Sequence, residues 1–190
     1  MKVAIQIDLL DVLERNVLDT QLRGDVDIVS RFEPQPGDQI TLKSGSYAVM
    51  PHPAWEEIAF GQEGRKAIVY QLKSNGRLFA FKVFKTAFRE PQLVDTCQGL
   101  SQLTFPGLEV CMRQCLTRAT AGPLIAQYPE LEYAILMPWI EGSTWFDILF
   151  SGTQISLDES QRLARSTAKI LSVLEQRGFA HCDMGASPEL

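Results

Sequence analysis

Short strand patterns, interrupted by only one helical pattern, constrain the fold of the central part of this chain more than any other feature. The predicted strands span residues 55–60, 67–72, 78–84, 108–116 and 131–139. Ser74-Asn75-Gly76, between the second and third strands, is a typical hairpin turn. The single helix begins near Pro91, which suits a first helical turn, and ends near Leu103. We therefore expect an antiparallel sheet with one packed helix, not the alternating strands and helices of a doubly wound sheet.

The pattern becomes helical after Gly142. We expect a short helix over about residues 143–150 and a long helix from about Leu157 to Arg177, ended by Gly178. The long helix carries an apolar stripe with little sequence left to cover it. Such an exposed stripe predicts self-association or binding of a partner.

Three regions follow from these patterns. Residues 1–50 form an N-terminal extension, with a helical spacing up to about residue 30 and then a short strand hairpin. Residues 51–138 contain the sheet, and residues 139–190 contain the later helices. We expect the extension to dock on the sheet or to mediate dimerisation.

Composition excludes several classes of partner. The chain has 190 residues, of which 45% are hydrophobic and 22% charged, and its formal net charge is -5. An acidic chain offers no basic surface for nucleic acid or anionic lipid. No apolar run approaches the roughly 18 residues that a membrane helix needs, and Asp8 and Asp11 interrupt the segment where a signal peptide would be apolar. We expect a cytoplasmic protein that does not contact membranes.

The cysteines favour a structural role. Their spacing contains no CxxC motif, and two histidines leave few further ligands for zinc. We expect buried, reduced thiols. The residues concerned are Cys97, Cys111, Cys115, Cys182, His52 and His181.

Lys82 is the most informative candidate for a functional residue. It lies within an apolar strand pattern, two residues after Ala80, so alternation puts the two side chains on one face. A lysine among apolar neighbours is costly to bury and calls for an anion. The alternative is a solvent-facing lysine on an edge strand.

Two further motifs flank this strand. The segment 61–67, Gly-Gln-Glu-Gly-Arg-Lys-Ala, lies between two predicted strands, and His181-Cys182-Asp183 follows the long helix. By itself the glycine segment is also consistent with an ordinary hairpin loop. In this order and spacing, the glycine segment, the strand lysine and the His-x-Asp motif resemble the protein kinase family over about residues 55–190.

This resemblance implies an α+β fold in which a kinase-like N-lobe, a five-stranded antiparallel sheet plus one helix, is followed by the first helices of an incomplete C-lobe. It implies that Gly61, Gly64 and Val69 belong to the loop that covers the phosphates of ATP. Only Gly64 coincides with a glycine of the GxGxxGxV pattern, since Gln62 and Ala67 stand at the others.

The resemblance also assigns the ATP contacts of the next elements. Ala80 leaves room for adenine, and Lys82 reaches the α and β phosphates. An acid on the following helix would pair with Lys82, and either Asp95 or Glu90 could do so, with Asp95 better spaced along the chain.

The hinge between the lobes is implied for residues 138–140, directly after the gatekeeper position. Met137 takes the gatekeeper position. The carbonyl group of Pro138 and the N–H of Ile140 would bind adenine, and a proline does not prevent this because its carbonyl group is retained.

Asp183 corresponds to the catalytic aspartate that accepts the proton of the substrate hydroxyl group. Five residues later the family has a magnesium-binding asparagine, but this chain has Pro188, and it contains no Asp-Phe-Gly. The sequence thus predicts a C-terminally truncated kinase-like chain that is inactive by itself. Mg²⁺ is expected only in a complete parent protein, whose activity would be phosphoryl transfer from ATP to a Ser/Thr hydroxyl group.

Two alternatives remain open. The first is a pseudokinase-type module that binds a nucleotide or a protein without catalysis. The second is an α+β interaction domain whose motif matches are accidental. The resemblance does not identify the substrate, which could be a protein or a small molecule.

Overall fold

The computed structural model describes residues 32–103, 112–142, 148 and 150–178. By its internal contacts the chain divides into two compact units. The described residues of one unit are 32–103 and 112–140, which form the sheet unit; those of the other are 141–142, 148 and 150–178, which form the helical unit. In the described residues, no helix is long and apolar enough to cross a membrane.

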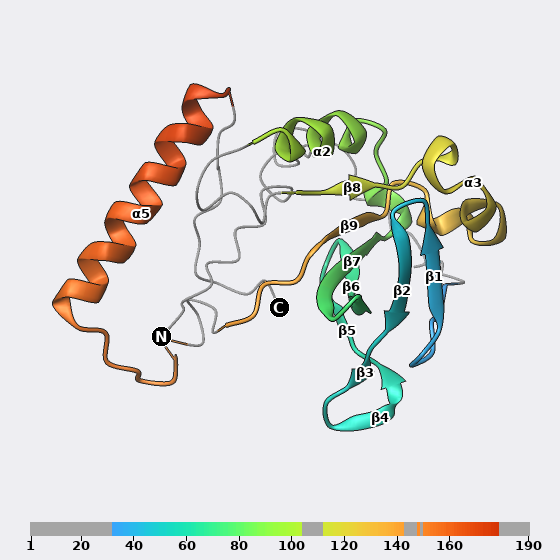
Figure 1. Ribbon diagram of the computed structural model, residues 1–190, viewed down its shortest axis with the longest axis horizontal. Helices are drawn as coiled ribbons and strands as arrows, with labels where there is room; N and C mark the ends of the chain where they lie inside the picture. The colour runs from blue at the N-terminus through green and yellow to red at the C-terminus, as the bar shows by residue number, and fades with distance from the viewer. Residues whose placement is uncertain (1–31, 104–111, 143–147, 149, 179–190) are drawn as a thin grey trace. The chain divides into compact units, whose positions relative to one another are not determined.

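The sheet unit is an α+β structure built on a curled antiparallel sheet (Figure 1). Its described strands are β1 (Gln39–Leu42), β2 (Gly45–Val49), β3 (Pro51–His52), β4 (Trp55–Ala59), β5 (Gly61–Glu63), β6 (Ala67–Ser74), β7 (Arg77–Phe84), β8 (Gln114–Cys115) and β9 (Ile135–Pro138). Seven of them form one sheet in the order β1-β2-β6-β7-β9-β8, with β5 also paired to β6.

The long hairpin β6–β7 is the centre of this sheet. Its eight residue pairs run from Ala67↔Phe84 to Ser74↔Arg77. Asn75 and Gly76 at the turn both have positive φ, 48° and 76°, as a two-residue type I′ turn requires. The hairpin predicted from Ser74-Asn75-Gly76 is confirmed.

One edge of β6 is shared by two strands with an excursion between them. β2 pairs with Leu72 and Lys73, while β5 pairs with residues 68–70. Between them β3 and β4 leave the sheet as a separate two-stranded ribbon. Three backbone hydrogen bonds close its base: Phe60 N–H to Met50 O (2.7 Å), Met50 N–H to Gln71 O (2.9 Å) and Gln71 N–H to Phe60 O (2.9 Å).

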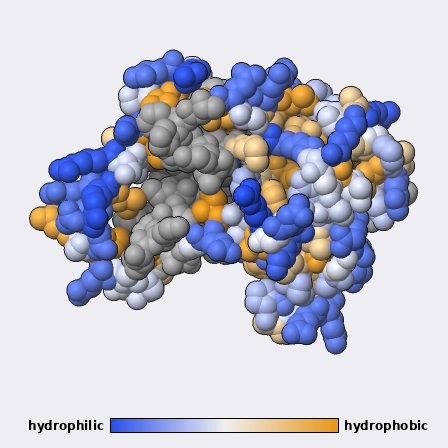
Figure 2. All heavy atoms as spheres, viewed as in Figure 1, coloured by the Kyte–Doolittle hydropathy of each residue, from blue (hydrophilic) through white to orange (hydrophobic). Residues whose placement is uncertain are grey.

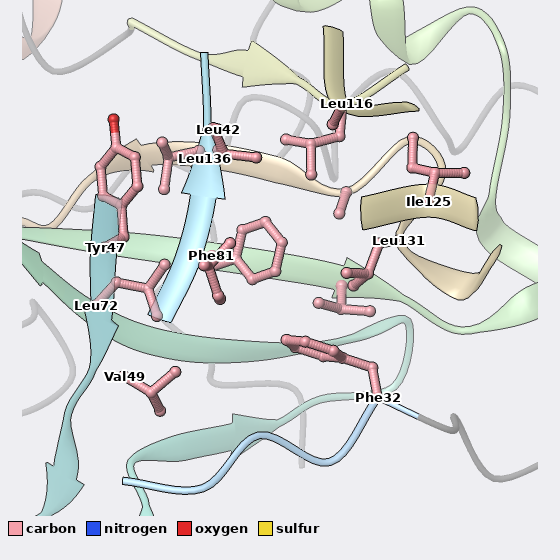
Figure 3. Close-up of a cluster of buried hydrophobic side chains, with 14 residues drawn as sticks. Phe32, Leu42, Tyr47, Val49, Leu72, Phe81, Leu116, Ile125, Leu131 and Leu136 are labelled. Atoms are coloured by element: carbon pink, nitrogen blue, oxygen red, sulfur yellow. The ribbon is translucent and has the colours of Figure 1, made fainter. Parts of the chain in front are cut away.

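The main hydrophobic core lies on one side of the sheet. Phe81 at its centre is completely buried, and Leu72, Leu136 and Phe32 surround it (Figure 3). The ring of Phe32 makes edge contacts with Tyr70, Phe81 and Tyr128, at ring-centre distances of 5.8, 6.0 and 5.3 Å. These contacts join the start of the described chain to the sheet through an aromatic cluster.

Helix α3 (Arg118–Gln127) and the 3₁₀ turn η4 (Pro129–Leu131) help to form this core through Ala121, Ile125 and Leu131. The Thr117 hydroxyl group accepts the Thr120 N–H, and the Thr120 side chain accepts the Thr117 N–H. Gly122, Pro123 and Pro129 predict a loop between the strands 108–116 and 131–139, and this prediction is wrong. A non-helical Ala121 (φ -139°) interrupts the helix, so Pro123 falls in the first turn of its second half, where proline is tolerated.

The predicted single helix is α2 (Leu93–Ser101), preceded by a 3₁₀ turn η2 (Thr86–Phe88). Its buried residues, Leu93, Cys97 and Leu100, recur at the spacing of one helix face. Together with α3, this gives the described sheet unit two α-helices, rather than the one that was predicted.

Other differences concern strand number and extent. The sheet has seven described strands rather than five because the hairpin β1–β2 is hydrogen-bonded to it and β5 takes the place of the predicted strand 55–60. The predicted strand 55–60 is formed as β4, but it pairs with β3 and not with β6. Only Gln114–Cys115 of the predicted strand 108–116 is described as a strand.

The helical unit contains α5 (Leu157–Gln176), as predicted. The Ser156 hydroxyl group accepts the Glu159 N–H, and the Glu159 carboxylate accepts the Ser156 N–H. Gly178 follows with φ +79°, as expected for a C-terminal cap. Most of the predicted helix 143–150 lies outside the described residues, as does the predicted helix in residues 1–30.

Candidate functional site

The side of the sheet opposite the main core brings together four residues that the sequence singled out. In an antiparallel sheet, directly paired residues project to the same face. Val69 is paired with Lys82, and Ala80 with Met137. Because Ala80 and Lys82 are two residues apart on β7, all four lie on one face. We call the side of the sheet that carries these residues the Lys82 face.

Lys82 is deeply buried, with only 4% of its surface exposed. Its ammonium nitrogen lies 5.1 Å from the centre of the Phe84 ring, which also projects from the Lys82 face. This contact places the cation over the electron-rich face of the ring. The alternative of a solvent-facing lysine on an edge strand is wrong, since β7 lies between β6 and β9.

Helix α2 packs at the β8 end of the same face. Cys115 is paired with Ile135, which is paired with Lys82, so Cys115 also projects from the Lys82 face. A hydrogen bond between the thiols of Cys115 and Cys97, together with burial, raises the pKa of Cys115. This contact connects α2 to the sheet, and both cysteines are buried and outside any disulfide, as the sequence predicted for them; Cys111 and Cys182 lie outside the described residues.

Neither acid proposed for Lys82 pairs with it. Asp95 is exposed, two positions from both Leu93 and Cys97, which puts it about 160–200° around the helix from the packed side. It forms no hydrogen bond or ion pair with another described residue. Glu90 lies before the helix, where its carboxylate accepts a hydrogen bond from the Gln92 side chain at 2.6 Å. The sheet-facing positions of α2 are occupied by leucine and cysteine, so this helix supplies no acid to the Lys82 face.

The glycine segment forms the tight hairpin between β5 and β6. The Gly64 N–H donates to the Ala67 carbonyl group at 2.8 Å, so this N–H is used within the turn. A Cβ on Gly61 would approach the Tyr70 ring to 3.1 Å, whereas a Cβ on Gly64 would make an ordinary contact at 3.6 Å. Gly61 is paired with Tyr70 and therefore packs on the side opposite Lys82. Its small size serves packing on an aromatic ring.

The segment after β9 carries the backbone groups that the family resemblance assigned to adenine. The Trp139 N–H donates to the Leu78 carbonyl group at 3.1 Å, which extends the pairing of β7 and β9. The Ile140 N–H forms no hydrogen bond with another described residue. The Trp139 ring lies 5.6 Å from the Phe60 ring, and this contact was not predicted from the sequence.

Two amide side chains on the Lys82 face were also missed. Gln62 is paired with Val69, and Gln71 with Ala80, so both project to the same side as Lys82. Alternation along β6 could have indicated Gln71, but its position in the apolar run 67–72 suggested a buried strand instead. The pairing of Gln62 depends on the β5–β6 turn, which the sequence treated as a flexible phosphate loop.

The remaining predicted site residue, Asp183, lies outside the described residues, as does His181. In the described parts of the chain, no group of three or more His, Cys, Asp or Glu side chains could hold a metal ion.

Comparisons with protein-family models, with curated proteins and with solved structures found no significant match to this chain.

Proposed function

We propose that the sheet unit binds ATP against its Lys82 face, as the N-lobe of a kinase-like fold. The observation that carries this proposal is the common face of Val69, Ala80, Lys82 and Met137. The parent activity would be phosphoryl transfer to a Ser/Thr hydroxyl group of a protein, with Asp183 as its catalytic residue.

The shape and polarity of the face support a nucleotide as the ligand. Ala80 and Met137 are paired and buried, and together with Val69 they make this part of the face apolar, as contact with an aromatic base requires. The N–H of Ile140 and the carbonyl group of Pro138 would supply the polar contacts for adenine. Gln71, paired with Ala80, is a further donor and acceptor next to this place.

Lys82 supplies the charge that phosphate requires. An ammonium group in a buried, low-dielectric setting attracts an anion more strongly than one in water does. Lys82 lies two residues along β7 from Ala80, so the charged part of the Lys82 face is separate from its apolar part. Lys82 would bind and orient the phosphates of ATP, while the protein kinase family adds an acid from the following helix to hold this lysine.

A second function, nucleotide binding without catalysis, is favoured by one observation. The packed side of α2 carries Leu93, Cys97 and Leu100, so the helix provides no acid to hold Lys82 in the way that catalysis by a kinase requires. The Gly64 N–H is engaged within its own turn, which weakens the case for a phosphate loop there.

Nucleotide binding is tested with a fluorescent ATP analogue and the Lys82→Met variant. We expect at least tenfold weaker binding, because a charge-assisted hydrogen bond to phosphate contributes about 1.5–3 kcal/mol. Lys43→Met is the matched control: Lys43 is exposed at the turn between β1 and β2, where its ammonium group contacts α3 on the other side of the sheet, and its loss should leave the affinity unchanged. Equal binding by wild type and Lys82→Met would contradict the proposal.

Asp95→Asn separates the role of Asp95 from that of Lys82. Since Asp95 is exposed on the outer side of α2, this variant should bind the nucleotide as tightly as the wild type. If nucleotide binds but phosphate transfer to a protein substrate is undetectable, the second function is the correct one.

A further inference from the structure

The ribbon formed by β3 and β4 is a structural feature for which the proposed nucleotide site has no use. It projects from the sheet between β2 and β5 (Figure 1) and forms a separate lobe in the space-filling view (Figure 2). Its described strands pair only with each other, through Pro51↔Ala59 and His52↔Trp55, and the register shifts between these two pairs so that residues 56–58 bulge out of the pairing. Four of the five residues of β4 are exposed, so its outer side is open to solvent.

The open strand combines large apolar side chains with acidic ones. Trp55 is 63% exposed and Ile58 is 57% exposed, although side chains of this size are usually buried. Between them stand Glu56 and Glu57, both exposed and neither forming an ion pair with a described residue. Along one short strand the order is therefore apolar, acidic, acidic, apolar.

The ribbon is held in a defined conformation and is not a loose loop. The His52 ring stacks on the Trp55 ring at 4.8 Å, and it meets the Phe60 ring edge-on at 5.6 Å. The Ala54 N–H donates to His52 Nδ1 at 3.1 Å, which fixes the orientation of the imidazole ring. With the three hydrogen bonds at its base, the strand is ordered before any partner arrives, which lowers the entropic cost of binding.

We propose that β4 is a docking strand for an extended, basic segment of another protein, which adds to the ribbon as a third strand. In such strand addition, main-chain hydrogen bonds give affinity and the alternating side chains give specificity. Directly opposed residues share a face, so the partner would place apolar residues opposite Trp55 and Ile58 and basic residues opposite Glu56 and Glu57. The predicted motif is apolar-basic-basic-apolar, which reads the same in both chain directions.

Charge decides between this partner and a second copy of the chain. Two copies of β4 paired with each other would bring four carboxylates together, and like charges opposite one another are destabilising. The chain as a whole has a net charge of -5, which also disfavours self-association and favours a basic partner.

The test uses the complete 190-residue chain and a fluorescein-labelled peptide, Thr-Val-Lys-Lys-Val-Thr, with binding followed by anisotropy at low salt. The control peptide Thr-Lys-Val-Val-Lys-Thr has the same charge and composition, but it places lysines opposite Trp55 and Ile58. We expect the first peptide to bind at least tenfold more tightly than the control, and binding to weaken at high salt.

The protein variant is the double substitution Glu56→Lys and Glu57→Lys, for which we expect at least a tenfold loss of affinity. Its matched control is Glu33→Lys with Asp95→Lys, which changes the net charge equally at two exposed positions outside the ribbon and should bind as the wild type does. Circular dichroism confirms that each variant is folded.

Three results would overturn the proposal. Equal affinity for the two peptides would show that the protein binds them through charge alone, without reading the order of apolar and basic residues. Equal loss in both double variants would place binding elsewhere on the acidic surface. A concentration-dependent dimer of the wild-type chain, strengthened by mixing it with the Glu56→Lys, Glu57→Lys variant, would show that a second copy occupies the strand.

Discussion

At the scale of single residues, burial and pairing distinguish side chains that the sequence treats alike. Lys73 and Lys82 stand on neighbouring paired strands, yet Lys73 is exposed and Lys82 is buried on the inner strand β7. Among the acids, Asp95 looked suitable from its spacing but lies on the outer side of α2. Chain distance alone therefore does not identify which charged side chains meet.

Cys115 provides a prediction of pH dependence at this scale. Its hydrogen bond with Cys97 and its burial raise the pKa of its thiol in the folded state. Above a pH of about 8.5, the pKa of a free cysteine, the unfolded chain releases this proton while the folded chain keeps it. The free energy of unfolding should then fall by up to about 1.4 kcal/mol per pH unit from this thiol.

Urea unfolding between pH 7.5 and 9.5 measures this effect, with Cys115→Ala as the comparison. The difference in stability between wild type and variant should be constant below about pH 8 and should shrink above it. A difference that stays constant across the whole range would show that the folded thiol ionises normally.

At the scale of elements, the hairpin β5–β6 shows how one glycine is required and another is not. We expect Gly61→Ala to lower the free energy of unfolding by about 1–3 kcal/mol, because its Cβ would press on the Tyr70 ring in the aromatic cluster of Phe32. Gly64→Ala should change it by less than about 0.5 kcal/mol, since its Cβ meets only an ordinary contact.

Urea unfolding of both variants checks the difference. Equal stability of the two would show that the Tyr70 ring moves aside without cost. If Gly64→Ala instead weakens binding of the ATP analogue while leaving stability unchanged, the glycine segment approaches the phosphates after all.

At the scale of the whole molecule, the division into two units predicts independent folding of the sheet unit. Among the described residues, the 14 buried side chains of its main core lie within residues 32–136. A fragment of residues 26–140 contains both long segments of this unit, 26–104 and 109–140, and should therefore show the circular dichroism of a sheet and unfold cooperatively in urea. A fragment without a cooperative transition would show that the core depends on the rest of the chain.

The sequence by itself determined the elements that depend on local interactions. The β6–β7 hairpin follows from a turn with two positive φ angles, which Asn75-Gly76 adopts readily. The helix α5 follows from its apolar spacing, and its end follows from Gly178. Val69, Ala80, Lys82 and Met137 could be proposed together because strand alternation is a property of each segment and the family resemblance supplied the strand order.

Only the tertiary structure decided what depends on contacts between distant segments. β5, rather than β4, pairs with the middle of β6 because the ribbon β3–β4 leaves the sheet, and no local pattern distinguishes these strands. Gly122 and Pro123 have weak helix propensities, yet helix α3 forms. Its apolar residues are buried in the core, and this burial outweighs the weak propensities. Burial is a property of the assembled sheet, so it also decided that Asp95 faces away from Lys82.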